Sequence, residues 1–77
     1  MPLKLLFFGV LTDATQTNEL SMDAVADTNA LKQVVADKFP GVAEYHYNLA
    51  VNQELQHENV PLSDGDEVAF MPPYSGG

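Results

Sequence analysis

Alternating apolar and polar positions divide the chain into short strands on either side of a helical segment. Residues 3–10 are rich in apolar and aromatic side chains and predict a first strand that closes near Gly9. Residues 12–18 are polar and turn-like, and residues 17–22 can pair back as a second, more polar strand. The sequence therefore predicts an N-terminal hairpin.

The middle of the chain predicts a helix, because apolar side chains recur there at three- and four-residue spacing. Asp27 or Thr28 is a plausible N-cap. Pro40 and Gly41 end the helix, since proline disfavours helical geometry in the residue before it and glycine permits a reversal. The side chains expected to form the buried stripe are Leu31, Val34, Val35 and Phe39.

Three more strands are expected after the helix. They cover residues 47–52, a short stretch around Leu55, and residues 67–71, and the last follows the Asp-Gly turn signal within residues 61–66. The prolines at 72–73 lack the donor that a ladder needs, so the sheet stops there. The expected order is strand, strand, helix, strand, short strand, strand. This order predicts an α+β protein. Its expected arrangement is a β-grasp (ubiquitin-like) mixed sheet with one main helix packed on one face.

A single domain with a tail is expected from the chain length. The 77 residues support one small core, and we assign residues 1–72 to the β-grasp domain. Residues 73–77 are expected to form a flexible tail that ends in two glycines and can extend roughly 17 Å. The tail has no charged side chain, so its terminal carboxylate could enter a narrow channel and be activated there.

Composition narrows the function classes. The chain has no Cys, so it cannot carry sulfur as a persulfide or use a thiol nucleophile. Its net charge of -8 argues against nucleic acid and against an anionic membrane. The charge fits basic protein partners, although solubility alone would also explain it. No segment is long enough to span a bilayer and no signal-peptide pattern is present, so a cytoplasmic protein is expected.

The remaining polar residues do not form a recognisable site. His46 and His57 are isolated and favour surface or packing roles. Asp64 and Asp66 are typical turn residues, since a calcium loop would need more ligands. No metal site is therefore expected. Three acidic residues belong either to a rim that meets a basic partner or to an ordinary solvated surface: Glu54, Glu58 and Glu67.

One face of the predicted sheet should remain apolar. Side chains alternate along a strand, so one set from the first and last strands joins the helix stripe in the core. The other set leaves Leu6, Phe8 and Met71 on the opposite face, beside the tail. This set predicts a docking surface for partner proteins, unless a loop covers it.

Three runs of sequence resemble the small, sulfur-carrier subunit of molybdopterin synthase. They are residues 5–9 (LLFFG), residues 50–54 (AVNQE) and residues 61–77 (PLSDGDEVAFMPPYSGG). The resemblance covers the whole chain and is most specific in the last run. Two places depart from the common pattern: residues 10–13 lack the Arg-Glu often found there, and Tyr74 replaces a smaller residue.

The resemblance implies a chemistry for the tail. An adenylating, E1-like activating enzyme would use ATP and magnesium to adenylate the carboxylate of Gly77, and sulfur would then replace the adenylate to give a thiocarboxylate. The larger synthase subunit would transfer this sulfur to cyclic pyranopterin monophosphate in molybdenum cofactor biosynthesis. The chain would then be a non-catalytic subunit of a heterotetramer and would bind no cofactor. The tail residues expected to bind the partner are Pro72, Pro73, Tyr74, Ser75 and Gly76.

Elementary chemistry agrees with this implied role but leaves alternatives open. A carboxylate is a poor electrophile until it forms a mixed anhydride with AMP, and glycines can thread where other residues would clash. A sulfur carrier for thiazole (thiamine) synthesis shares the fold and the terminal glycines. A ubiquitin-like protein modifier would instead be joined to lysines through Gly77. A β-grasp interaction module with an idle tail is the third alternative.

Overall fold

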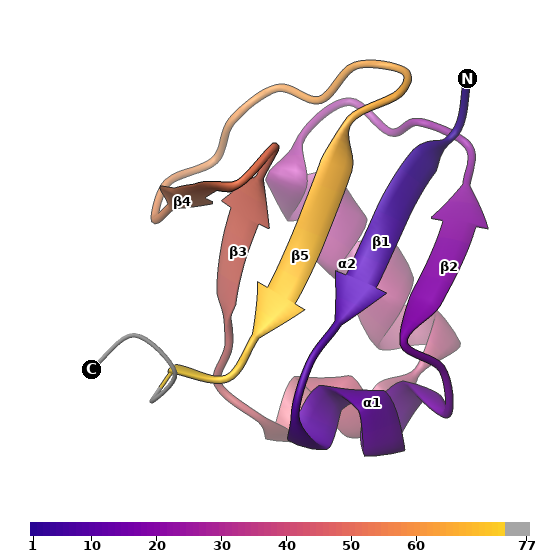
Figure 1. Cartoon of the computed structure of the whole chain (residues 1–77), viewed down its shortest axis with the longest axis vertical. Coiled ribbons are helices and arrows are strands. Elements are labelled where there is room, and N and C mark those ends of the chain that lie inside the picture. The colour runs from indigo at the N-terminus through magenta and orange to yellow at the C-terminus, as the bar shows by residue number, and fades with distance from the viewer. Residues whose placement is uncertain (74–77) are drawn as a thin grey trace.

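The computed structural model describes residues 1–73 and contains one five-stranded mixed sheet. Its strands run in the order β2-β1-β5-β3-β4, with β1 parallel to β5 and the other neighbours antiparallel (Figure 1). The predicted mixed sheet is thus confirmed. The strands are β1 Leu3–Phe7, β2 Glu19–Met22, β3 Asn48–Val51, β4 Glu54–Gln56 and β5 Glu67–Met71.

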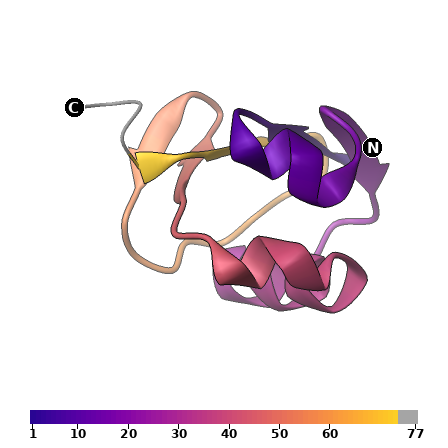
Figure 2. The ribbon, with the colours of Figure 1, turned by 90° about the horizontal axis from the view of Figure 1, so that it is seen from below.

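Helices cover one face of this sheet. The main helix α2 (Thr28–Lys38) and the 3-10 helix η1 (Pro40–Glu44) lie together below the strands (Figure 2). Of the two predicted N-caps, Asp27 is the one observed, because its carboxylate accepts a hydrogen bond from the Ala30 N–H at 2.8 Å. The helix ends one residue before Phe39, as the following proline predicts. No helix within residues 1–73 is long and apolar enough to cross a membrane.

The core lies between the sheet and α2. Leu31 and Val35 of the predicted stripe are buried, whereas Val34 and Phe39 are only half-buried. Aromatic contacts join the layers: the ring of Phe7 lies 5.0 Å from that of Phe70 and meets Phe39 edge-on at 6.2 Å, measured between centroids. The strand residues that join this core are Leu3, Leu5, Phe7, Leu49, Val68 and Phe70.

The segment after the first strand contradicts the sequence prediction. It forms a helix, α1 (Val10–Thr15), where a polar turn was expected, and β1 ends at Phe7. Gly9 breaks the strand with a φ of 59°, which glycine adopts without strain. The buried Thr15 places its hydroxyl 3.0 Å from the carbonyl oxygen of Leu11 and 2.8 Å from that of Thr17. The expected second strand from residue 17 consequently begins later, at Glu19.

The turn between β3 and β4 is attached to β5 through Asn52. Asn52 and Gln53 both have positive φ, which asparagine tolerates better than most residues. The Asn52 N–H donates to the Glu67 carbonyl at 2.7 Å, and the Glu67 N–H donates back to the Asn52 side-chain oxygen at 3.0 Å. The Asn52 amide also donates to the Asp66 carboxylate at 3.0 Å. We call these three bonds the Asn52 clamp; they fix the β3–β4 hairpin against the start of β5.

Candidate functional site: an open apolar face beside the end of β5

The face of the sheet opposite α2 carries a hollow made by two alanines. The strand registers align Leu6 with Ala69, Ala69 with Ala50, and Ala50 with Leu55. This row crosses four strands, from β1 to β4, and its two small side chains lie between two leucines. The two small side chains therefore leave a hollow on this face, and three alternate residues of β5 line it: Glu67, Ala69 and Met71.

This hollow is an open depression of about 380 Å³, here called the β5 depression. The three predicted docking residues all line it, so the prediction that they share one face is confirmed. Phe8 is 47% exposed and Leu55 is 53% exposed, so no loop among the described residues buries the face. The part these residues play in docking remains a prediction. The lining residues are Leu6, Phe8, Ala50, Gln53, Leu55, Glu67, Ala69 and Met71.

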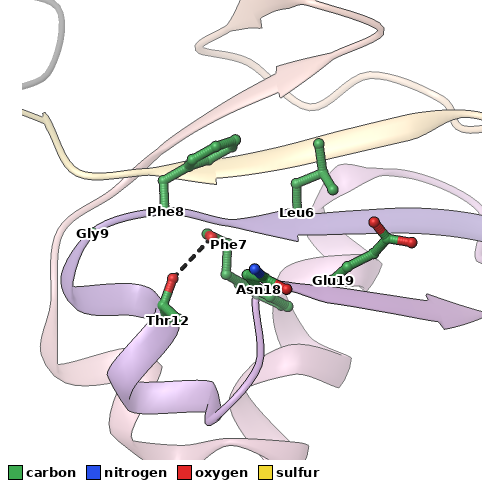
Figure 3. Close-up of a pocket in the computed structure, with 7 residues that line it drawn as sticks. All are labelled: Leu6, Phe7, Phe8, Gly9, Thr12, Asn18 and Glu19. Atoms are coloured by element: carbon green, nitrogen blue, oxygen red, sulfur yellow. Dashed lines mark hydrogen bonds between the residues drawn. The ribbon is translucent and has the colours of Figure 1, made fainter.

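A second open depression of about 380 Å³ lies on the other side of Leu6 and Phe8, between β1, α1 and the start of β2. Figure 3 shows Leu6 and Phe8 pointing to one side of β1, whereas Phe7 points to the other. The Thr12 hydroxyl donates to the Phe7 carbonyl at 3.0 Å, which fixes the turn into α1 (Figure 3). Leu6 and Phe8 thus form a ridge between the two depressions.

The described chain leaves the sheet next to this ridge. Because β1 and β5 are parallel and adjacent, their C-terminal ends lie side by side at one end of the sheet (Figure 1). The Phe8 N–H donates to the Phe70 carbonyl at 3.1 Å, which brings Phe8 level with the end of β5. Pro72 is buried and Pro73 is exposed. The other predicted tail residues lie outside the described part of the chain: Tyr74, Ser75, Gly76 and Gly77.

The open face carries an ion pair. Its lysine, Lys4, lies 3.9 Å from the Glu19 carboxylate, and both side chains are about half exposed. Residues 1–73 contain one other ion pair, between the Met1 amino group and Asp64 at 3.9 Å. The two remaining lysines, Lys32 and Lys38, belong to α2 in the helix layer. Glu67 lines the β5 depression and makes no ion pair among residues 1–73, so this part of the face favours a basic partner.

Tyr47 is an ionisable residue that packs against the core. Burial raises the pKa of the Tyr47 phenol, whose ring packs 5.2 Å from that of Phe70, so it is neutral at physiological pH. His46 and His57 are both exposed. Within residues 1–73, no group of three or more His, Asp or Glu side chains is placed to hold a metal ion.

The strand order defines a β-grasp domain whose last strand ends beside an open apolar face. The chain belongs to the ThiS family, whose model matches residues 5–77. It is 40% identical to the Escherichia coli (strain K12) protein named molybdopterin synthase sulfur carrier subunit, over 97% of this chain and 99% of that one. The resemblance seen in the sequence is thereby confirmed.

Solved structures confirm the predicted ubiquitin-like β-grasp fold. The chain is similar to a protein in the complex of subunits 1 and 2 of molybdopterin-converting factor from Helicobacter pylori 26695, with a TM-score of 0.75, 29% identity and full coverage of both chains. The small archaeal modifier protein 1 from Methanosarcina acetivorans gives a TM-score of 0.80 at 22% identity, covering 99% of this chain and 96% of that one. At that identity, the second similarity concerns the fold alone.

Proposed function

We propose that this protein is the sulfur carrier subunit of a molybdopterin synthase and has no catalytic side chain of its own. The observation that carries the proposal is the 40% identity to the Escherichia coli subunit over nearly the whole of both chains. The similarity to a chain from the Helicobacter pylori complex supports a larger subunit as partner. The absence of Cys agrees with a carrier that holds sulfur on its terminal carboxyl group rather than on a thiol.

The reactive group in this proposal is the carboxylate of Gly77. It attacks the α-phosphorus of ATP in the activating enzyme, and pyrophosphate leaves. A sulfide-level sulfur nucleophile then attacks the carbonyl carbon of the mixed anhydride, and AMP leaves. The resulting thiocarboxylate donates its sulfur to cyclic pyranopterin monophosphate in the larger subunit, and an oxygen from water restores the Gly77 carboxylate. ATP and magnesium belong to the activating enzyme, and this chain holds neither.

The open face explains how the partner would place the tail. A protein seated on the Leu6–Phe8 ridge also covers the end of β5, because the Phe8 N–H bonds the Phe70 carbonyl there. Pro72 and Pro73 follow at once and restrict the start of the tail, so less entropy is lost when the tail enters a channel. Two such pairs would make the heterotetramer implied for the family.

Deletion of Gly77 tests the proposal in cells. A strain that carries only the shortened chain should lose molybdenum cofactor, and thiazole synthesis should be unaffected. Normal cofactor production in that strain would contradict the carrier role and favour an idle tail. Loss of thiazole instead would favour the thiamine pathway. A ladder of protein conjugates that disappears with Gly77, with cofactor production retained, would favour a protein modifier.

A further inference from the structure

Glu67 is the one charged residue among those that line the β5 depression. The alanine floor, Leu6, Leu55 and the other walls are apolar, apart from the amide of Gln53. Glu67 lies at the N-terminal end of β5 and is only partly exposed. The depression therefore offers a groove of apolar surface with a carboxylate at one end.

The backbone around Glu67 is held in place before any partner binds. The Asn52 clamp bonds both its carbonyl (2.7 Å) and its N–H (3.0 Å). On the other side, β1 pairs with β5 so that Lys4 aligns with Glu67. A fixed backbone on both sides sets the point from which the side chain extends, so no backbone ordering is needed when it forms a contact.

The Glu67 carboxylate makes no ion pair with any residue of the described chain. The cation nearest in register, Lys4, is instead paired with Glu19 at 3.9 Å. When a partner covers the depression and excludes water, a carboxylate left without a cation costs free energy. This cost favours a partner that brings a positive charge to the Glu67 end of the groove.

We infer that the larger synthase subunit places an Arg or Lys side chain in the β5 depression, with its cation on the Glu67 carboxylate. The aliphatic stem of such a side chain would pack on Ala50, Ala69 and Leu55, since long basic side chains bury their stems while the charged head meets a polar group. This assignment rests on the proposed function. It makes Glu67 a residue that sets partner specificity, because a partner with an apolar or acidic residue at that point would leave the carboxylate unpaired.

The test is the affinity of the full chain for the purified larger subunit, measured by titration calorimetry at low and high salt. The variant is Glu67→Gln, which keeps the shape and removes the charge. The matched control is Glu44→Gln, which removes one charge from an exposed residue at the end of η1, in the helix layer. We expect Glu67→Gln to weaken binding about tenfold or more at low salt, and the control to change it by less than about twofold.

Salt dependence gives a second readout that a purely structural role would not change. The affinity of the wild type and the control should fall more steeply with salt than that of Glu67→Gln, which lacks the ion pair. Thermal unfolding of both variants, followed by circular dichroism, should match the wild type. If Glu67→Gln and the control bind alike, the Glu67 contact is wrong and the proposed function stands. If the wild type itself does not bind the larger subunit, the proposed function fails, and this assignment fails with it.

Discussion

Replacing Phe8 by Ala should weaken partner binding far more than the accompanying loss of unfolding free energy can account for. The ring is 47% exposed in the free protein. An aromatic side chain has roughly 200 Å² of surface, so about 100 Å² of Phe8 is available to a partner. At about 25 cal/mol per Å², covering that area contributes at most about 2.5 kcal/mol, because part of it offsets the costs of association. We expect the dissociation constant to rise about 10- to 50-fold.

The backbone of Phe8 should survive the substitution. Its N–H donates to the Phe70 carbonyl at 3.1 Å and its carbonyl accepts the Leu11 N–H at 3.2 Å, and neither bond involves the ring. Loss of the buried half of the ring should lower the free energy of unfolding by about 1–2 kcal/mol. Calorimetric titration with the larger subunit and urea denaturation of the free chain measure the two effects separately.

Val35→Ala is the matched control, because it should lower stability by a similar amount from the opposite layer. Val35 is 1% exposed on α2, and its truncation removes about 2 kcal/mol by lost burial and a small cavity. Its affinity for the larger subunit should equal that of the wild type while the domain remains folded. If Phe8→Ala binds as tightly as Val35→Ala, the open face is not the docking surface.

Two further substitutions test the structure. Thr28 is buried, and its hydroxyl oxygen accepts a hydrogen bond from the Val60 N–H at 3.1 Å. Thr28→Val should therefore lower the free energy of unfolding, measured by urea denaturation, by about 1–3 kcal/mol. An unchanged midpoint would contradict this bond. The amide of Asn52, and then the Ser63 N–H, lower the pKa of Asp66. A lowered folded pKa adds stability above the unfolded pKa, and this stability is lost as pH falls through the folded value. Asp66→Asn should therefore be less stable than the wild type near pH 7, and the difference should shrink below the ordinary Asp pKa of 3.8; a constant difference across pH would contradict the assignment.

The sheet and the main helix could be predicted from the sequence because the patterns that indicate them lie within short segments of the chain. The alternation in β1 and β5 separated core residues such as Leu5 and Phe70 from open-face residues such as Leu6 and Met71, and the burial pattern agrees. Asp27 and Pro40 marked both ends of α2 to within about two residues. Side-chain alternation and helix-capping residues can be recognised in the sequence without knowing the tertiary contacts.

The missed helix α1 depends on contacts that the sequence does not display. Six residues are too few for a stable helix alone, and two of the six are threonines of low helix propensity. The sequence offered only the i, i+4 spacing of Leu11 and Thr15 after Gly9. In the structure both residues are buried and Gly9 has a positive φ. Neither residue shows that η1 packs against this segment, so propensity favoured a turn.

The lining of the open face was predicted only in part for a similar reason. Leu6, Phe8 and Met71 could be identified from strand alternation, whereas Leu55 belongs to a three-residue strand whose face depends on its register with Ala50. The Asn52 clamp joins positions about 15 residues apart. Such pairings follow from the closed fold and have no local pattern.

The mass of the intact chain, purified from cells that are making molybdenum cofactor, shows whether Gly77 carries sulfur. We expect a population in which one oxygen is replaced by one sulfur, and fragmentation should place that sulfur on Gly77. The population should disappear when the activating enzyme is deleted. A chain that carries only an ordinary terminal carboxylate, in cells with normal cofactor synthesis, would contradict the proposed carrier role.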